Sequence, residues 1–402
     1  MIFRTPVLAY VVIAVGFFLR LAYVTFVSPI KHMLFSDMGN YASISEQILD
    51  GKWEASHFFQ PIGYPLVLVL LKLMTANWLE WLQWLHLISG TLTLWIFWKT
   101  IRESMGEKMG LISLLVASLH LQWIVFTGVA LAENLFMLFL SILAWSSLKI
   151  VREKKFHHAV LWGTTFFLAF LLKGVHVFLA PLFILGLLYF FRRSSYKLIA
   201  VMTIIVATGL MSHGLFTKEK IGKFQMSASA GGLNFVEGKC PLKNNADNNG
   251  HSWLSPLYHQ LGLTELRRWD HPFTDSGYFM REGVKCIQEN PFVLIQSMEG
   301  IPFLFVGNLL WPANQTWMRN QMRLYDLFFG CLSLIGLVIY FRFLRTSTNR
   351  QEEILVWVLP ALTCFLCVYI FKSEIRFRIP FDIWFIPMTV KGWVQLFRAR
   401  PA

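Results

Sequence analysis

The chain has 402 residues, of which 55% are hydrophobic and 15% carry charge. A typical soluble protein has about 25% charged residues, so this composition excludes an ordinary soluble domain, a disordered chain, a collagen, a coiled coil and a disulfide-dense secreted module. It indicates a polytopic membrane protein. The net charge of +13 does not indicate nucleic-acid binding, because Lys and Arg form short clusters between apolar runs, as the positive-inside rule describes.

Twelve apolar runs follow one another along the sequence, and the first is predicted to be retained as a span. Run 61–75 opens with Pro61, Gly63 and Pro65, and run 292–311 contains Glu299 and Pro302, so neither is expected to cross. With the basic linkers on one side, this predicts about ten transmembrane helices and two cytoplasmic termini. The runs are 6–27, 61–75, 79–98, 109–127, 131–150, 158–172, 175–191, 198–215, 292–311, 324–344, 353–371 and 380–396. The basic linkers are 99–108, 152–155, 192–197, 342–350 and 391–400.

This topology divides the chain into a transmembrane bundle (1–215) with a first outer loop (28–78), an outer domain with an interfacial helix (216–323), and C-terminal transmembrane helices (324–402). Segment 216–291 is polar and rich in turn signals, so we expect a small, loop-rich unit. Cys240 and Cys286 would both lie in it on the oxidising side. A disulfide and two separate thiols are equal alternatives for them.

The first outer loop predicts a short amphipathic helix. Asp37 stands at the expected N-cap and Gly51 at the expected C′ position, while Tyr41, Ile44 and Ile48 share one face. Asp37 can serve as a helix cap, as a catalytic carboxylate, or as both.

Further charges are expected on the outer side. Glu133 stands at the outer start of a span, where it can be a helix-start acid or a functional group. Lys173, Arg376 and Arg378 are cations on the side that should be poor in them, and arginine forks suit a phosphate. Arg20, inside the first span, needs a partner. Together with Asp37, these residues predict an outward-facing pocket of carboxylates and phosphate-binding cations, without an evident set of metal ligands.

In motif order, nearly the whole chain resembles the GT-C glycosyltransferases that use polyprenyl-phosphate sugars, a group related to the dolichyl-phosphate-mannose protein mannosyltransferases and the lipid A aminoarabinose transferases. Two departures stand out. Ile62 replaces the second proline of the family's Pro-Pro-Gly-Tyr-Pro, and Met38 replaces the second acid of its first loop, which weighs against a shared metal site. The matching motifs are Arg20-Leu21, Asp37 with Tyr41, Ala42 and Gly51, Pro61–Pro65, Glu133, Lys173 with Pro181, Gly232–Phe235, Tyr278–Pro291 and Arg376–Pro380.

The resemblance implies an inverting membrane glycosyltransferase that acts at the extracytoplasmic face of the cell (inner) membrane. Asp37 would be the general base, and Lys173, Arg376 and Arg378 would bind the donor phosphate. The substrate would be positioned by Glu133, Tyr41, Tyr64, Arg20 and His57, of which His57 is a lesser candidate. The implied partners are a polyprenyl-phosphate-linked sugar, an acceptor lipid, glycan or protein, and membrane lipids. A divalent metal is compatible with the sequence but is not indicated by it.

Two other functions fit the same residues. A flippase or transporter for a lipid-linked glycan would use similar cations, although the sequence lacks the internal repeats expected of such proteins. A lipid-linked glycan ligase or polymerase would share the outer site and take longer donors.

Overall fold

The computed structural model describes residues 5–32, 34, 36–240, 272–306, 316–373 and 375–398. The regular secondary structure of these residues is entirely helical. This agrees with the predicted fold class, an all-α polytopic membrane protein.

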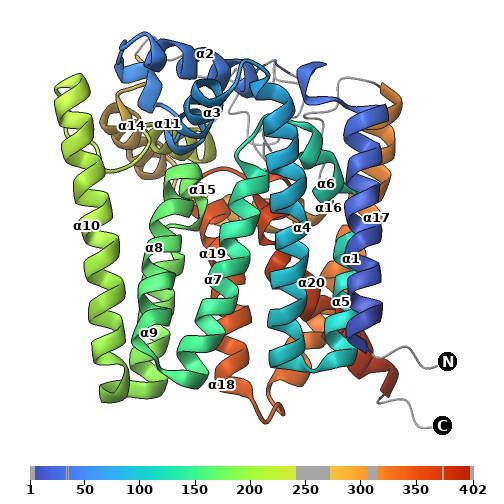
Figure 1. The fold of residues 1–402 in the computed structure, drawn as a ribbon. Coiled ribbons are helices and arrows are strands. Elements are labelled where there is room, and N and C mark those ends of the chain that lie inside the picture. Colours follow the sequence, from blue (N-terminus) through green and yellow to red (C-terminus); the bar gives the residue numbers. More distant parts are fainter. Residues whose placement is uncertain are drawn as a thin grey trace.

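The longer helices, together with the short α6 and α18, form a bundle (Figure 1). Five segments of the described chain are long and apolar enough to cross a membrane: Pro6–Val27, Glu133–Glu153, Gly174–Ile221, Met322–Leu344 and Arg350–Ile370. A bent pair, Glu107–Ser118 with Leu121–Gly128, would make a sixth. The count of ten spans therefore stays a prediction. The bundle helices are α1 (Thr5–Ala22), α4 (Trp78–Met105), α5 (Glu107–Ser118), α6 (Leu121–Val125), α7 (Glu133–Glu153), α8 (Phe156–Leu172), α9 (Leu179–Phe191), α10 (Tyr196–Ile221), α17 (Thr316–Leu344), α18 (Arg350–Glu353), α19 (Leu359–Ile370) and α20 (Ile375–Arg398).

Shorter elements connect the bundle helices or gather at one end of them. The helix of run 61–75 has 12 residues, too few for a helix that must cross about 30 Å of hydrocarbon. The short elements are η1 (Tyr23–Val27), η2 (Ile30–His32), α2 (Asp37–Leu49), η3 (Ala55–Phe58), α3 (Gly63–Met74), η4 (Phe126–Gly128), η5 (Gly174–His176), η6 (Arg192–Ser195), α11 (Ala230–Lys239), α14 (Ser276–Glu289), α15 (Val293–Gln296), η7 (Ser297–Glu299), α16 (Gly300–Val306) and η8 (Ile354–Val358).

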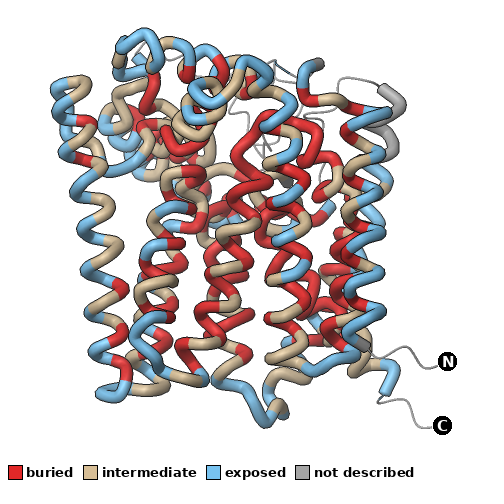
Figure 2. Tube along the Cα trace, in the orientation of Figure 1, coloured by how far each residue is buried: buried red, intermediate tan, exposed pale blue. Residues whose placement is uncertain are grey.

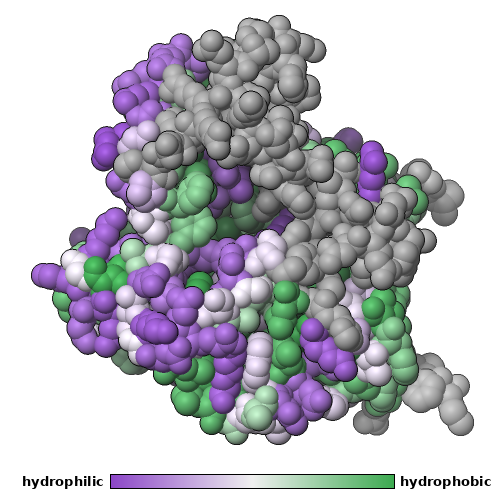
Figure 3. All heavy atoms as spheres, turned by 90° about the horizontal axis from the view of Figure 1, so that it is seen from above, coloured by the Kyte–Doolittle hydropathy of each residue, from purple (hydrophilic) through white to green (hydrophobic). Residues whose placement is uncertain are grey.

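The two ends of the bundle carry different segments of the chain. Figure 1 shows α2, α3, α11 and α14 at the upper end, while α1 begins and α20 ends at the lower end. The lower end also carries the junctions of α4 with α5, α7 with α8, and α9 with α10, where basic linkers were predicted. Seen from above, many residues of the described part of the upper end are hydrophilic, with hydrophobic residues among them (Figure 3). The arrangement matches the predicted separation of basic linkers from the outer loops.

Burial follows the position of each helix in the bundle. Figure 2 shows buried residues concentrated along α7, whereas α10 lies at the edge and is mostly intermediate or exposed. On α1, apolar side chains such as Val11, Val15 and Phe18 are 46–63% exposed. Large exposed apolar surfaces are typical of a lipid-facing helix, because lipid tails are as apolar as these side chains.

The predicted first-loop helix is present as α2, and its end has the expected chemistry. Gly51 has a φ of +76°, which favours glycine, and its N–H donates to Ile48 O while the next N–H, of Lys52, donates to Gln47 O. This is the Schellman pattern of helix termination. The start differs from the prediction: Ser36 occupies the N-cap position, and Asp37 is the first helical residue. The Asp37 carboxylate is consequently available for other contacts.

The unit predicted as loop-rich contains helices in its described part. α10 continues to Ile221, beyond the predicted end of its apolar run, and α11 and α14 pack against each other. The side chain of Asp275 caps α14 by accepting from the N–H of Tyr278, and the helix ends before Asn290-Pro291. The turn-rich stretch 243–250 lies outside the described residues.

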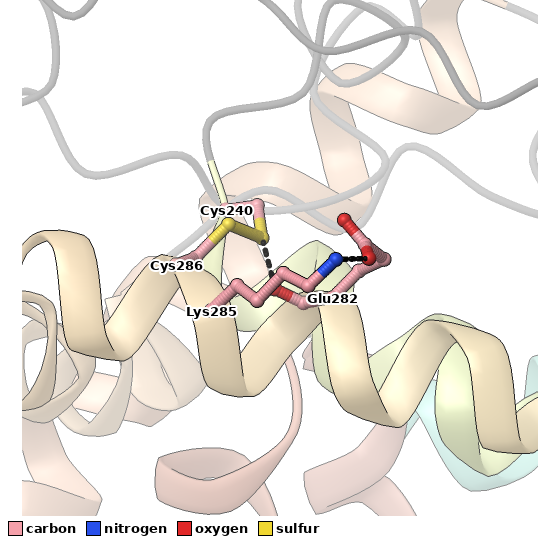
Figure 4. Close-up of a disulfide and its surroundings, with 4 residues drawn as sticks. All are labelled: Cys240, Glu282, Lys285 and Cys286. Atoms are coloured by element: carbon pink, nitrogen blue, oxygen red, sulfur yellow. Dashed lines mark hydrogen bonds and ion pairs between the residues drawn. A yellow bond between two sulfur atoms is a disulfide. The ribbon is translucent and has the colours of Figure 1, made fainter.

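Cys240 and Cys286 form a disulfide that joins the end of α11 to α14 (Figure 4). Their Cα atoms are 5.5 Å apart. Phe279 and Val236 are fully buried beside the disulfide and form a small apolar core with the two cysteines. Of the two alternatives that the sequence leaves open, the structure therefore has the disulfide.

Candidate active site

Arg376 joins two carboxylates from distant parts of the sequence. Its Nη1 donates to Asp37 Oδ2 at 2.9 Å, and its Nε donates to Glu133 Oε1. Arg376 lies in the first turn of α20, while Asp37 and Glu133 are the first residues of α2 and α7. Acidic groups are favoured at helix N-termini, where the backbone carries a partial positive charge. The starts of three helices therefore meet around one guanidinium.

Lys173 brings a second cation to the same carboxylate. It is the C-cap residue of α8, and its Nζ lies 2.7 Å from Glu133 Oε1. The Glu133 side chain is fully buried, whereas those of Lys173 and Arg376 are 10% and 14% exposed. Two cations offset the cost of burying this carboxylate. Glu133 Oε2 has no hydrogen-bond partner in the described part of the chain, so it can accept a hydrogen bond from a ligand.

Gln60 is a site residue that sequence reasoning missed. Its Nε2 donates to Asp37 Oδ1 at 2.9 Å, so both oxygens of Asp37 are engaged. Gln60 Oε1 is buried and, among the described residues, has no partner. The sequence feature that could have identified Gln60 as a site residue is its position as a polar side chain directly before the Pro61–Pro65 motif.

Two tyrosines line the side of this cluster. The rings of Tyr41 and Tyr64 meet edge to face with centroids 5.2 Å apart. Burial raises the pKa of Tyr41 well above its ordinary value, and the nearby charges of Asp37 and Glu133 raise it further. Tyr41 therefore stays a neutral hydrogen-bonding group at physiological pH. The Tyr64 hydroxyl lies 3.2 Å from Nε2 of His86, within the bundle.

His57 has a different role in the structure from the one considered for it. Its Nδ1 accepts from the N–H of Glu54, and its Nε2 therefore donates to Gln47 Oε1 at 2.7 Å. Burial lowers the pKa of His57, against a smaller opposing effect from Glu54. These contacts tie η3 to α2, and no described contact joins His57 to Asp37.

Arg20 is fully buried and holds two helices together. Its Nη1 donates to Gly16 O in α1 at 2.9 Å and to Ser118 O in α5 at 3.4 Å. The described residues provide no carboxylate within ion-pair distance of Arg20. Its contacts are therefore with backbone carbonyls, and none of them reaches the Asp37 carboxylate.

Arg378 belongs to a second cluster and does not join Arg376, contrary to the sequence prediction. Its Nη1 donates to Leu304 O at 3.1 Å, and its other nitrogens lie 3.3 Å from Asp382 and 3.8 Å from Asp326. Asp382 also lies 3.2 Å from His120 Nε2. All of these charged side chains are fully buried. The cluster links α17, α20 and the bend between α5 and α6, and it has no described contact with Asp37 or Lys173.

The segment that leads to Arg376 is held by α11. The Lys239 Nζ donates to Tyr369 O, and Lys372 pairs with Glu237 at 2.7 Å. A Cβ on Gly238 would lie 1.8 Å from the carbonyl oxygen of Phe371. Only glycine allows this approach. The disulfide-linked helices α11 and α14 are thus held against residues 369–372, just before the site, through α11.

The site combines two carboxylates, Asp37 and Glu133, with two cations, Lys173 and Arg376, so its formal charge is zero. Within the described ranges, no group of three or more His, Cys, Asp or Glu side chains could hold a metal ion. The arrangement can take a proton at a carboxylate and stabilise an anion beside it.

The chain is similar in sequence and in fold to proteins that are already known. Residues 60–213 match the family model described as dolichyl-phosphate-mannose-protein mannosyltransferase. The crystal structure of an oligosaccharyltransferase from Archaeoglobus fulgidus, tethered with an acceptor peptide, is similar with a TM-score of 0.53 and 13% identity, over 97% of this chain and 50% of that one. The chain has a GT-C-like fold.

The other comparisons give a weaker structural match or no match. ArnT from Cupriavidus metallidurans, bound to undecaprenyl phosphate, gives a TM-score of 0.40 at 13% identity over 96% of this chain and 77% of that one. No curated protein matches the sequence. The chain spans half the length of the archaeal enzyme. In this GT-C-like chain the matched segment contains Gln60, Glu133 and Lys173, while Asp37 and Arg376 lie outside it.

Proposed function

We propose that this protein is an inverting membrane glycosyltransferase that moves a sugar from a polyprenyl-phosphate donor to an acceptor hydroxyl or amine. The observation that carries the proposal is the convergence of Asp37, Glu133, Lys173 and Arg376 from separate helices into one partly exposed cluster. The name of the matching family, which describes transfer of mannose from a lipid phosphate to protein, supports the same class of donor.

The proposed reaction is a single displacement at the anomeric carbon. The acceptor forms a bond to this carbon as the bond to the phosphate oxygen breaks, and the electron pair leaves on the polyprenyl phosphate. Asp37 takes the acceptor proton, which is the role of a general base. Arg376 and Lys173 stabilise the departing phosphate, as preorganised cations do for charge that develops in a transition state. No general acid is needed, because the leaving phosphate is already an anion.

Two buried acceptor atoms suit a sugar. Glu133 Oε2 and Gln60 Oε1 lack partners among the described residues, and buried polar atoms without partners are uncommon in folded proteins. Sugar hydroxyls are hydrogen-bond donors and would satisfy both. We therefore assign Glu133 and Gln60 to sugar positioning, and Tyr41 to the neighbouring wall.

The proposed orientation places this site at the extracytoplasmic face of the cell membrane and the two termini in the cytoplasm. Its support is the separation of the basic linkers from the site-bearing end of the bundle. In the proposed organisation, residues 1–215 and 324–402 form the membrane part and 216–323 the outer part. The acceptor is a protein, a lipid or a glycan.

The experiment is a transfer assay with purified protein in lipid nanodiscs, a panel of undecaprenyl-phosphate sugars, and a membrane extract as the acceptor source. Release of undecaprenyl phosphate together with a new glycosidic bond identifies a transferase, whereas movement of intact donor between leaflets identifies a flippase. Asp37→Asn should lower transfer by about 100-fold or more, the usual contribution of a general base. Asp50→Asn, on the same helix but exposed, is the control. Normal turnover in Asp37→Asn would refute the base assignment.

A further inference from the structure

Arg376 contacts two carboxylates that differ in their surroundings. Glu133 is fully buried and also pairs with Lys173, while the Asp37 side chain is 25% exposed. Breaking a fully buried ion pair leaves a charge without solvent, whereas the Asp37 carboxylate reaches water and loses less when its partner leaves. The contact with Asp37 is therefore the weaker of the two, and it can be exchanged while the contact with Glu133 remains.

Both oxygens of the Asp37 carboxylate accept a hydrogen bond from another side chain. Oδ1 accepts from Gln60 and Oδ2 accepts from the Arg376 guanidinium. A guanidinium at 2.9 Å occupies one of the two lone-pair directions of Oδ2, and it restricts the approach of an acceptor hydroxyl, which must come within hydrogen-bond reach of the base. Movement of Arg376 away from Oδ2 would open that approach.

We infer that Arg376 covers the base until the donor binds, and that the donor phosphate draws the guanidinium from Asp37 to itself. This inference deepens the proposed function and rests on it. The phosphate replaces the Asp37 carboxylate as the partner of Nη1, while Nε stays on Glu133. Asp37 Oδ2 then becomes more accessible to the acceptor. Binding of the donor therefore favours binding of the acceptor.

Removal of a side chain from a binding site usually weakens binding of the ligand. This inference predicts the opposite effect on phosphate affinity when the Asp37 carboxylate is removed. If Asp37 and the phosphate compete for Arg376, removing the Asp37 charge strengthens binding of the phosphate. We expect Asp37→Asn and Asp37→Ser to bind undecaprenyl phosphate about fivefold more tightly than the wild type, which is the lower end of typical coupling between two ligands of one group. Arg376→Gln should bind it more weakly.

The test is a double-mutant cycle on undecaprenyl phosphate affinity, measured on purified full-length protein in nanodiscs. In the Arg376→Gln background, Asp37→Asn should no longer tighten binding, because the shared partner is gone. Asp50→Asn is the matched control, since it removes a carboxylate at the exposed end of the same helix. Thermal unfolding verifies that each variant is folded.

The outcomes separate the inference from the proposed function. Unchanged or weaker binding by both Asp37 variants, in a protein that transfers sugar, would overturn the covering role of Arg376 and leave the transferase assignment intact. Equal tightening by Asp37→Asn with and without Arg376 would also overturn it, because the gain would then be a general charge effect. Absence of transfer by the wild type is a failure of the proposed function, and the transfer assay detects it independently.

Discussion

Arg376 and Arg378 lie two residues apart at the start of α20, yet their guanidinium groups serve different carboxylates. Arg376 pairs with Asp37 and Glu133 in the candidate site, and Arg378 pairs with Asp326 and Asp382 inside the bundle. Residues at i and i+2 of a helix do not share a face. The two arginines therefore have separate roles: Arg376 is the proposed donor-binding residue, and Arg378 fixes the helix that carries it.

The first prediction concerns Arg378. Arg378→Gln leaves two buried aspartates without their cation, which typically costs about 3–5 kcal/mol. We expect a lower midpoint of thermal unfolding in detergent. Arg376→Gln should instead weaken undecaprenyl phosphate binding, with a smaller loss of stability. If Arg378→Gln unfolds like the wild type but loses phosphate affinity as Arg376→Gln does, the assignment of the two arginines is incorrect.

The second prediction concerns Glu133. Glu133→Gln removes the negative charge that neutralises both Lys173 and Arg376 at one buried oxygen. We expect a loss of stability of about 3 kcal/mol or more, together with a loss of transfer. Glu46→Gln is the control, because its pair with Lys72 involves a Glu46 side chain that is 68% exposed. Equal thermal midpoints for the two variants would contradict this account of Glu133.

The third prediction concerns the contact between α11 and the segment before Arg376. Gly238→Ala forces a Cβ against the carbonyl of Phe371, so this segment must move. Because Arg376 follows a few residues later, we expect a higher KM for the lipid donor. Gly231→Ala makes the same change in α11 where a Cβ meets nothing within 4 Å. The KM of Gly231→Ala should equal that of the wild type. An unchanged KM in Gly238→Ala would remove α11 from the positioning of Arg376.

The fourth prediction concerns pH and Lys239. Burial lowers the pKa of Lys239 from 10.5 to about 8. Between these values the unfolded chain binds more protons than the folded protein, so stability rises with pH in this window. The contribution of Lys239 to the free energy of unfolding is therefore least favourable below pH 8 and most favourable above pH 10.5. The difference between these two limits is about 3 kcal/mol, because each pKa unit corresponds to about 1.4 kcal/mol.

The measurement for Lys239 is the thermal midpoint of the wild type and of Lys239→Met between pH 7 and 9.5. Methionine keeps much of the length of the side chain and does not titrate. The difference between the two proteins should shift in favour of the wild type as the pH increases. A difference that is constant across this range would show that Lys239 does not titrate there.

Local patterns in the sequence predicted the broad architecture. Apolar runs and basic linkers depend on short windows of sequence, and they gave the helical membrane class and the separation of linkers from outer loops. Gly51 likewise marked the end of α2, because a left-handed residue at C′ favours glycine. The predicted number of ten spans is not confirmed by the structure. The helices Trp78–Met105 and Ile375–Arg398 carry polar residues, and they are not among the five segments that are long and apolar enough to cross a membrane.

The features that the sequence did not predict depend on where the chain becomes helical. Arg376 and Arg378 were both expected to bind the donor phosphate, but α20 begins at Ile375, and the helical rotation between the two residues separates their side chains. Segment 216–291 was expected to be rich in turns, whereas Gly231 and Gly232 both lie in α11. In Gly232 and Gly238 the missing side chain allows close packing against Ser276 and Phe371. Such contacts are made across long sequence separations, so no local pattern reveals them.

The bond between Asp37 and Arg376 spans 339 positions of the sequence, and this has a consequence for biosynthesis. Ribosomes add residues from the N-terminus, so Asp37, the proposed base, is made long before Arg376. The helices that precede α20 can enter the membrane while this cluster is still incomplete. The proposed donor site can therefore assemble only after α20 has been translated and has packed against the earlier helices.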